Sequence, residues 1–333
     1  MNHKARRPTL QDVADKVGAS KMTVSRYLRE PQQVAVATAQ KIALAMEELG
    51  YIHNRVPDML ANAKSRAIGV LLPSMSNQVF SSVVRGIESV TGPAGLHALY
   101  GHYGYTMARE EQQIEQLLSF NVDGLILSET QHTDRTLRML EIAAIPVVEI
   151  MELPERPIDL AVGLNHAAAA QVMVSLMLAK GRKRIAYLAA RLDHRTRQRE
   201  AGYLAALAKA GFEPILIHTD QPSCFTLGGQ LLRDALQVAP DLDGVFCTND
   251  DIAAGAMLAC QALGLRVPEQ ISVAGFNALD IGLALAPQLA SVITPREAIG
   301  RLAAERLIGR IEGRHYPDKV VDLAYEIFLG QSL

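Results

Sequence analysis

The sequence predicts a small all-α module followed by an α/β body of two doubly wound parallel-sheet subdomains. In residues 9–50, apolar residues recur at helical spacing in three short segments. From Ala67 onward, short β-branched runs alternate with helical stretches, in one series over 67–164 and a second over 184–294. Strands separated by helices form parallel sheets, so two series indicate two such subdomains.

Charge is distributed unevenly along this chain of 333 residues, whose formal net charge is only -2. Residues 1–66 hold eleven Lys and Arg against six Asp and Glu, whereas the remainder holds 22 against 29. A basic segment on an acidic body indicates a small module that binds a polyanion and a larger part with another task.

Neither a membrane segment nor a secretion signal is expected. No apolar run approaches the ~18 residues of a membrane helix, and the basic N-terminus, MNHKARRPTLQD, lacks the apolar stretch of a signal peptide. The three cysteines, Cys224, Cys247 and Cys260, form no CxxC motif. They indicate thiols in a reducing compartment, so we expect a cytoplasmic protein with no metal site and no cofactor.

Three short helices are expected in the N-terminal module. Thr9 is a candidate N-cap, with Asp12 three residues later as a variant of the capping box. Gly18 ends the first helix and Ser20 caps the second, while Thr38 is expected to open the third. Two helices joined by a glycine turn and backed by a third form a helix-turn-helix, whose second helix enters the major groove of DNA.

The second helix lies within SKMTVSRYL, and one of its faces carries Lys21, Met22, Ser25 and Arg26. A solvated surface helix could show the same face. In a helix-turn-helix these side chains meet DNA instead, since lysine and arginine donate to guanine and an apolar group can contact the methyl of thymine.

Residues 9–54 contain the frame LxDVAxxxGxSxxTVSRxL, the stretch V(S/A)xxTxxKI and a closing LGYxxN. Through these motifs the segment resembles the DNA-binding part of the LacI/GalR repressor family. The resemblance implies a homodimer on a near-palindromic double-stranded operator. It places base reading at Lys21, Met22 and Arg26, and phosphate contacts at Thr9, Thr23 and Ser25.

The next stretch, NRVPDMLANAKSRAIGV, resembles the hinge of the family, which becomes helical on operator DNA. We assign residues 54–66 to this hinge, with Asn54 and Arg55 as DNA contacts at its start. Leu60 matches the leucine that inserts between base steps in the minor groove. A leucine that simply packs within the protein is the alternative.

The resemblance continues through KGRKRIAYLAARLDHRTRQREAGY, LDGVFCTNDDIAAGA and VPEQISVAGFN and covers the whole chain. It implies a periplasmic-binding-protein-like core whose effector lies between two subdomains. The expected boundaries are 1–53 for the DNA-binding domain, 54–66 for the hinge and 67–333 for the core. The N-subdomain would span 67–163 and 292–320, and the C-subdomain 164–291 and 321–333.

Candidate effector contacts follow from the family pattern, position by position. They are Ser74, Gln78, Phe80, Ser128, Glu149, Arg199, Asn249, Asn277 and Arg296. Arg199 matches the arginine that grips hydroxyls or a carboxylate, and Asn249 matches a ligand-contacting asparagine. Asp250, beside Asn249, is expected to cap a helix.

Two departures from the family pattern favour an anionic effector. Neutral-sugar binders usually carry aspartate where Asn277 stands, and Arg296 lies near a position that lines the pocket. A guanidinium binds a carboxylate or phosphate through two parallel hydrogen bonds, so Arg199 and Arg296 are its candidate partners. The alternative for Arg296 is an ion pair with Glu297 or Glu305. The segments KMTVSRYLR, LLPSMSNQVF and SVITPRE resemble the gluconate and idonate utilisation repressors of the family, whose effectors are sugar acids.

An enzymatic body is not expected. Asp250 and Asp251 follow a strand, yet no Ser-His-Asp order, HExxH, Walker A or strand-following GxGxxG is present, and His166, His194 and His218 are expected in surface or loop positions. The predicted function is a DNA-binding transcriptional repressor controlled by a gluconate-like sugar acid. A corepressor-dependent or neutral-sugar-responsive regulator and a transport-linked sugar-binding protein are the alternatives.

Overall fold

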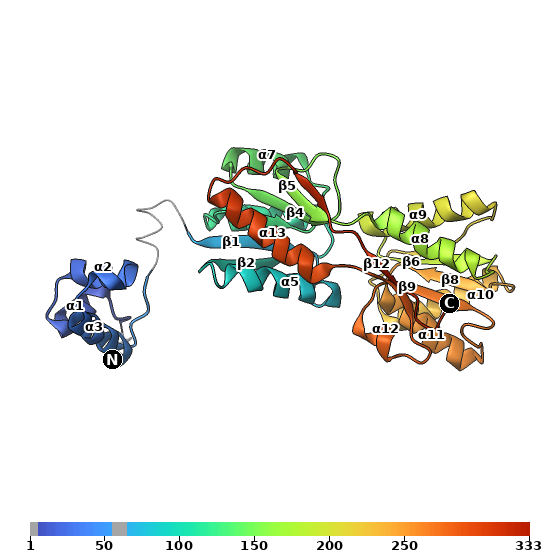
Figure 1. Ribbon diagram of the computed structural model, residues 1–333, viewed down its shortest axis with the longest axis horizontal. Helices are drawn as coiled ribbons and strands as arrows, with labels where there is room; N and C mark the ends of the chain where they lie inside the picture. The colour runs from blue at the N-terminus through green and yellow to red at the C-terminus, as the bar shows by residue number, and fades with distance from the viewer. Residues whose placement is uncertain (1–5, 55–64) are drawn as a thin grey trace, which may run out of the picture. The chain divides into compact units, whose positions relative to one another are not determined.

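The computed structural model describes residues 6–54 and 65–333 (Figure 1). The chain divides into two compact units, the first ending at Ser65 and the second spanning Arg66–Leu333. The expected DNA contacts Arg55 and Leu60 lie outside the described residues.

The N-terminal unit is helical: α1 (Leu10–Val17), α2 (Lys21–Arg29), the 3-10 turn η1 (Pro31–Gln33) and α3 (Val36–Leu49). Thr9 and Asp12 form the predicted capping box, and Gly18 ends α1 in the left-handed region at φ 70°. The hydroxyl of Ser20 accepts from the backbone N–H of Thr23 at 3.1 Å and caps α2. These local signals fix the tight turn between α1 and α2.

The third helix begins earlier than the sequence predicts. Thr38 is expected to open it, but α3 starts at Val36 and its N-cap is Ala35, which makes no side-chain hydrogen bond. The carbonyl of Ala35 accepts from the N–H groups of Thr38 at 2.8 Å and Ala39 at 2.9 Å. The backbone therefore closes this turn without a capping side chain.

The helices of the N-terminal unit enclose a small core. It consists of Val13, Ala14, Val24, Val34, Ile42 and Ala45. Because Val24 occupies this core from the middle of α2, the opposite face of α2 points outward.

The second unit contains two six-stranded sheets. The first has the order β11-β5-β4-β3-β1-β2 with every pair parallel; the second has the order β12-β10-β9-β8-β6-β7, and in it only the β10–β12 pair is antiparallel. The first sheet consists of β1 (Ala67–Leu72), β2 (His97–His102), β3 (Leu125–Leu127), β4 (Val147–Met151), β5 (Leu160–Gly163) and β11 (Val320–Asp322). The second consists of β6 (Ile185–Ala190), β7 (Ile215–Thr219), β8 (Gly244–Cys247), β9 (Ser272–Asn277), β10 (Ala290–Ile293) and β12 (Glu326–Phe328).

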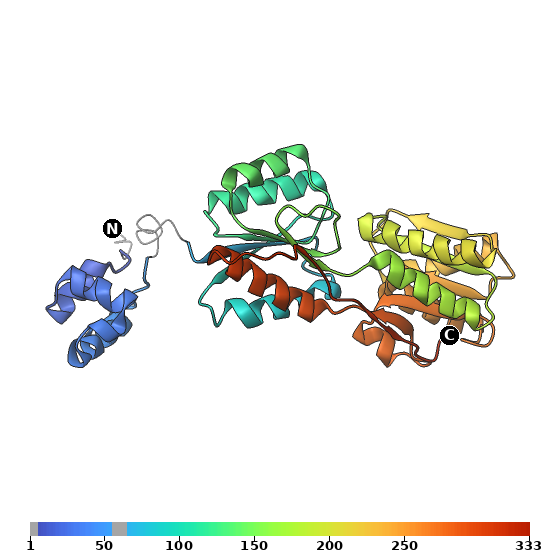
Figure 2. The same ribbon diagram turned by 45° about the horizontal axis from the view of Figure 1, so that its top comes forward.

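Helices cover both faces of each sheet. The first sheet carries α5 (Gln78–Thr91), α6 (Met107–Ser119), α7 (Asp134–Ala143) and α13 (Arg296–Ile311), and the second carries α8 (His166–Ala179), α9 (His194–Ala210), α10 (Phe225–Val238), α11 (Asp250–Leu263) and the short α12 (Asp280–Ala284). Figure 1 and Figure 2 show α5 and α13 side by side on one face of the first sheet and α6 and α7 on the other. We call each sheet with its helices the first and the second subdomain. The predicted doubly wound α/β class is confirmed.

Glycines allow α5 and α13 to pack backbone to backbone. A Cβ on Gly86 would lie 2.1 Å from the carbonyl oxygen of Glu297, and one on Gly300 would lie 2.1 Å from that of Val83. Any side chain at either position would push the two helices apart, so this pair of glycines fixes their close contact.

The chain passes between the two sheets three times, after Gly163, after Ile293 and after Asp322. The first crossing is where the sequence predicts it. The other two lie a little beyond the expected positions near 291 and 321, because Ile293 still pairs with Asn277 and Asp322 still pairs with Gly163. None of the helices within the described ranges is long and apolar enough to cross a membrane.

Both sheets reverse their strand order beside their first strand, since β1 lies between β2 and β3, and β6 lies between β7 and β8. In open α/β sheets a ligand crevice forms outside the carboxyl ends of the strands at such a switch point. The loops that follow β1, β3, β6 and β8 are therefore where topology places a binding site.

Candidate functional site

The outward face of α2 carries cations and an exposed apolar side chain. Lys21 and Arg26 are exposed, and 73% of the surface of Met22 is accessible to solvent. Within the described ranges neither Lys21 nor Arg26 forms an ion pair, so their donors are available to an external partner. This is the arrangement that base reading in a major groove requires.

The other predicted DNA contacts of this unit lie at the start of α1, within α2 and after α3. Thr9 is exposed, and its hydroxyl donates to the carboxylate of Asp12 at 2.7 Å. Thr23 and Ser25 are half-buried, and the hydroxyl of Thr23 lies 2.9 Å from that of Ser20. Asn54 is exposed at the end of the described segment.

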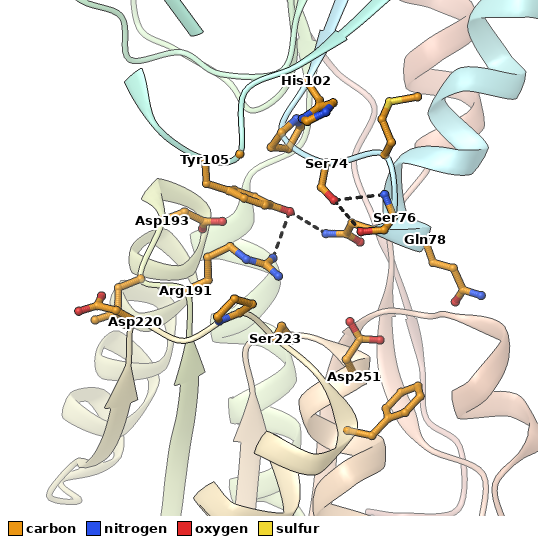
Figure 3. A pocket seen from close by; sticks show the side chains of 17 residues that line it. Ser74, Ser76, Gln78, His102, Tyr105, Arg191, Asp193, Asp220, Ser223 and Asp251 are labelled. Atoms are coloured by element: carbon orange, nitrogen blue, oxygen red, sulfur yellow. Dashed lines mark hydrogen bonds between the residues drawn. The ribbon is translucent and has the colours of Figure 1, made fainter. Parts of the chain in front are cut away.

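The second unit has a pocket of about 980 Å³ at the predicted switch points (Figure 3). Loops from both subdomains line it. The polar side chains are Ser74, Ser76, Asn77 and Gln78 after β1, His102 at the end of β2 and Tyr105 after it, Arg191 and Asp193 after β6, Asp220 and Ser223 after β7, and Asp251 after β8. We call it the large pocket.

A small pocket of about 30 Å³ adjoins the large one and shares Asn77, Tyr105, Arg191 and Asp193 with it. Its remaining lining is Val79, Phe80, Met151, Ala190, Arg195, Thr196, Arg199, Thr248, Asn249 and Asn277. Thirty Å³ is about the share of one water molecule in the liquid. A sugar-sized ligand would therefore occupy the large pocket or widen the small one.

We call the large and the small pocket together the cleft. The predicted effector contacts are distributed between the cleft and the protein that surrounds it. Ser74 and Gln78 line the large pocket. Phe80, Arg199, Asn249 and Asn277 line the small one. Ser128, Glu149 and Arg296 line neither of the two pockets.

Ser128 and Glu149 are buried and engaged within the first subdomain. The hydroxyl of Ser128 donates to the carbonyl of Leu71 at 3.0 Å. One carboxylate oxygen of Glu149 accepts from the N–H of Ile158 at 2.6 Å, and the other lies 3.8 Å from Nε2 of His132. These two side chains support the cleft from behind its surface.

His132 is held between two carboxylates, since its Nδ1 also lies 3.1 Å from Glu110. Burial disfavours the charged imidazolium, but the hydrogen bond with Glu110 and the negative charges of Glu110 and Glu149 outweigh it and raise the pKa of His132 to about 9. The predicted ligand residue Glu149 thus belongs to a buried ionic cluster with a protonated histidine.

Arg296 stands behind the lining of the small pocket. Its Nη1 donates to the carbonyl of Asn277 and, at 3.1 Å, to the hydroxyl of Thr294. Neither ion pair considered from the sequence forms, because Glu297 lies near Arg85 and Glu305 near Arg301. Arg296 therefore supports the backbone at Asn277.

Arg199 is buried, and its donors already have acceptors. It contacts Nδ1 of His166 at 3.2 Å, donates to the carbonyl of Thr248, and stacks 3.9 Å from the ring centre of Phe276. Burial lowers its pKa to about 10. His166 is wholly buried, so its expected surface position is wrong; burial pushes the pKa of His166 well below its usual value, which keeps it a neutral acceptor.

Asn249 caps α11, because its Oδ1 accepts from the N–H of Ile252 at 3.1 Å. The expectation that Asp250 is the cap is wrong. Asp250 is buried and accepts from the N–H of Leu279 at 2.5 Å and the hydroxyl of Ser291 at 2.6 Å. Burial raises the pKa of Asp250 to about 7.

An ionic cluster that the sequence did not reveal joins the two subdomains. Arg195, on α9, donates to the carbonyl of Ser128 at 2.7 Å, to Glu129 at 2.9 Å and to Glu152 at 3.2 Å. Glu152 also lies 2.5 Å from Nδ1 of His194. Its acidic members follow β3 and β4, and its basic members begin α9. We call Arg195, His194, Glu129 and Glu152 the bridging cluster.

A second contact between the subdomains was also missed. Nη1 of Arg191 donates to the hydroxyl of Tyr105 at 3.1 Å, and its guanidinium lies 4.3 Å from the centre of that ring. Asn77 donates to the same hydroxyl at 2.9 Å. The sequence could have indicated Arg191 by its position, because it directly follows a predicted strand, at the edge of the sheet where ligands bind.

The side chains that line the cleft are suited to binding a ligand and not to catalysing a reaction. The polar groups of the cleft hold one another in fixed positions, and no nucleophile with an adjacent base emerges among the lining residues. In the described part of the chain, no group of three or more His, Cys, Asp or Glu side chains could hold a metal ion.

A helix-turn-helix unit followed by a two-subdomain α/β body with a polar cleft defines a class of DNA-binding regulators. The profile described as "Bacterial regulatory proteins, lacI family" matches residues 9–54, and that described as "Periplasmic binding proteins and sugar binding domain of LacI family" matches 65–324. The chain belongs to the LacI family.

Known proteins resemble this chain over nearly its whole length. It is 52% identical to the HTH-type transcriptional regulator GntR of Escherichia coli K12, over 99% of this chain and 100% of that protein. It is 48% identical to the regulator IdnR of the same strain, over 98% and 99%. A Lac repressor dimer bound to operator and the anti-inducer ONPF superposes with a TM-score of 0.86 at 26% identity, over 98% and 99% of the two chains. The protein is thus a DNA-binding transcriptional regulator and not an enzyme.

Proposed function

We propose that the protein is a repressor that binds a near-palindromic operator as a homodimer, with an operator affinity controlled by a sugar acid such as gluconate in the cleft. The likeness to a repressor dimer on its operator supports the dimer. The resemblance to gluconate and idonate utilisation repressors supports the effector class. A regulator of transcription acts where the DNA is, so we place it in the cytoplasm.

On the DNA side, we propose that Lys21, Met22 and Arg26 read bases from the exposed face of α2. Thr9, Thr23 and Ser25 would contact phosphates. Residues 54–66 would form the hinge between a DNA-binding domain over 1–53 and a core over 67–333, with Asn54, Arg55 and Leu60 as its DNA contacts. Replacing Leu60 with Ala should weaken operator binding and leave effector binding intact.

The observation that carries the effector proposal is the charge of the small pocket. Three arginines, Arg191, Arg195 and Arg199, line it, against one carboxylate, Asp193. Arg195 is paired with Glu129 and Glu152, so the support comes from Arg191, a guanidinium without an ion pair in the described structure, which favours a carboxylate over a neutral sugar. Ser74, Gln78, Phe80, Asn249 and Asn277 would supply polar and apolar contacts to the rest of the ligand.

The test is calorimetric titration of the full-length protein with gluconate, 6-phosphogluconate and glucose, each repeated while operator binding is followed by fluorescence anisotropy. Binding of an acid in preference to glucose supports the proposal. Equal or tighter binding of glucose contradicts it and leaves a carbohydrate-responsive regulator. The direction of the anisotropy change separates an inducer from a corepressor.

A further inference from the structure

The arginines near the cleft differ in how many of their donors are already used. Arg195 donates to a carbonyl and two carboxylates, Arg199 is held by His166 and the carbonyl of Thr248, and Arg296 is held by Asn277 and Thr294. A guanidinium has five N–H donors, and once they meet buried acceptors a ligand must displace those acceptors to bind.

Arg191 combines unused donors with a place in the pocket lining, whereas Arg296, whose Nε has no acceptor in the described structure, lines neither pocket. The hydrogen bond of Arg191 to a side chain, from its Nη1 to the neutral hydroxyl of Tyr105, leaves most of its donors unused, and within the described ranges it forms no ion pair. It also lines both pockets. An incoming carboxylate can therefore contact this cation without breaking an internal ion pair.

The backbone holds Arg191 and Tyr105 in an unusual conformation that aims them at each other. Both residues lie in the left-handed region of the backbone, at φ 62° for Arg191 and φ 60° for Tyr105, a conformation that residues other than glycine rarely adopt. The N–H of Arg191 donates to the carbonyl of Thr219 at 3.0 Å, which ties it to the end of β7. Such strain persists where surrounding structure imposes it, and it is concentrated at ligand sites.

A carboxylate faces the same pocket from another loop. Asp251, in the first turn of α11, lines the large pocket, and Figure 3 shows its carboxylate and the guanidinium of Arg191 extending into one space. The charge of Arg191 acts on Asp251, yet the two form no ion pair in the described structure. Asp193 and Asp220 also line the large pocket. Asp251 lies across the space from Arg191 (Figure 3), so a ligand that reaches both would meet a guanidinium at one end and a carboxylate at the other.

We propose that Arg191 binds the carboxylate of the effector and that Asp251 accepts hydrogen bonds from its hydroxyl tail. This orientation rests on the proposed sugar-acid function and deepens it. It replaces Arg199, whose donors are taken, and Arg296, which lines neither pocket, as the partners of the effector charge. It also makes the ligand a monoanion, because a phosphate on the end of the tail would meet the negative charge of Asp251.

The experiment compares gluconate with 6-phosphogluconate on the full-length protein and three variants, by calorimetry. Arg191→Gln should weaken gluconate binding by about tenfold or more, since it removes a charged donor. Arg191→Lys keeps the charge without the two-donor fork and should lose less. Asp251→Asn should reduce the preference for gluconate over 6-phosphogluconate. Arg197→Gln, on the exposed face of α9, is the matched control and should bind as wild type.

The outcomes separate the two proposals. If the wild type binds neither acid, the sugar-acid function itself fails. If it binds gluconate and Arg191→Gln binds it equally well, the function stands and Arg191 is not the anchor. If the wild type prefers 6-phosphogluconate, or Asp251→Asn leaves the ratio of the two affinities unchanged, the assigned orientation is wrong. Thermal melting of each variant verifies that a lost affinity does not come from unfolding.

Discussion

The exposed face of α2 and the lining of the cleft both present cations, but in opposite states. Lys21 and Arg26 extend into solvent without an internal partner in the described structure, whereas Arg195 and Arg199 are buried among acceptors of their own protein. The first surface is ready for an external polyanion. In the second, the donors of Arg195 and Arg199 already have acceptors, so a small anion gains most at a donor without one, as at Arg191.

This difference predicts that cations of the cleft matter for stability and cations of α2 matter for binding. Breaking a buried ion pair leaves an uncompensated charge in low dielectric, while removing an exposed cation leaves nothing unsatisfied. Four substitutions test the contrast, in order of decreasing effect.

The largest effect is expected for Arg195→Ala. It leaves Glu129 without its counter-charge and Glu152 with only His194 beside it, and the side chains of Arg195 and Glu152 are only 6% and 1% exposed. Removing one partner of a buried pair costs about 3–5 kcal/mol of unfolding free energy. Urea unfolding followed by circular dichroism measures the loss.

Arg197→Ala is the matched control for that measurement, because Arg197 lies exposed two residues further along α9. Its unfolding free energy should stay within about 0.5 kcal/mol of wild type. A similar small loss for Arg195→Ala would mean that the bridging cluster contributes no net stability.

The second effect concerns pH and His132. Its pKa is raised to about 9 in the folded protein, so the native state holds a proton that the unfolded chain releases near its ordinary pKa of about 6.5. The stabilisation is complete below pH 6.5 and is lost as pH rises to 9, by an amount on the order of 3 kcal/mol. Urea unfolding at closely spaced pH values measures it.

His132→Gln should abolish this part of the pH dependence and leave a flatter profile between pH 6.5 and 9. The same variant should keep its affinity for a sugar acid if Glu149 supports the wall of the cleft. An unchanged pH dependence would mean that His132 does not hold the extra proton, and a loss of effector affinity would mean that the cluster of His132 and Glu149 contributes to binding.

The third effect is on DNA. Arg26→Ala removes a donor that can contact a guanine and should weaken operator binding by about 1–3 kcal/mol while hardly changing stability. Anisotropy titrations with the operator and with unrelated DNA measure both affinities. If the two fall by the same factor, Arg26 contacts phosphate and does not read sequence.

Local signals were enough to predict much of the fold. The capping box at Thr9, the turn at Gly18 and the alternation of strands and helices each depend on residues close in the chain, and the structure has them all. Thr38 misled because a backbone carbonyl, at Ala35, replaced the capping side chain.

The cleft was less predictable, because the state of each side chain depends on acceptors distant in sequence. Arg199 is occupied by His166, Arg296 by the carbonyl of Asn277, and Arg195 by Glu129. The sequence around each of these arginines does not indicate which distant acceptor it will meet. The sequence does show where a strand ends, and Arg191 directly follows the end of a predicted strand. A list of every polar residue in the loops at the switch points would therefore have included Arg191.

The smallest effect is expected at Met22. It concerns the contact between this side chain of α2 and the methyl group of a single thymine. Met22 is an apolar side chain exposed to 73%, on the face of α2 that also carries Lys21 and Arg26. Met22→Ala should weaken operator binding by about 1 kcal/mol if the side chain packs on the methyl of a thymine. Repeating the titration on an operator with deoxyuridine in place of thymidine removes that methyl. The penalty of Met22→Ala should then vanish, whereas an unchanged penalty would mean that Met22 acts through the stability of α2 or through the sugar–phosphate backbone.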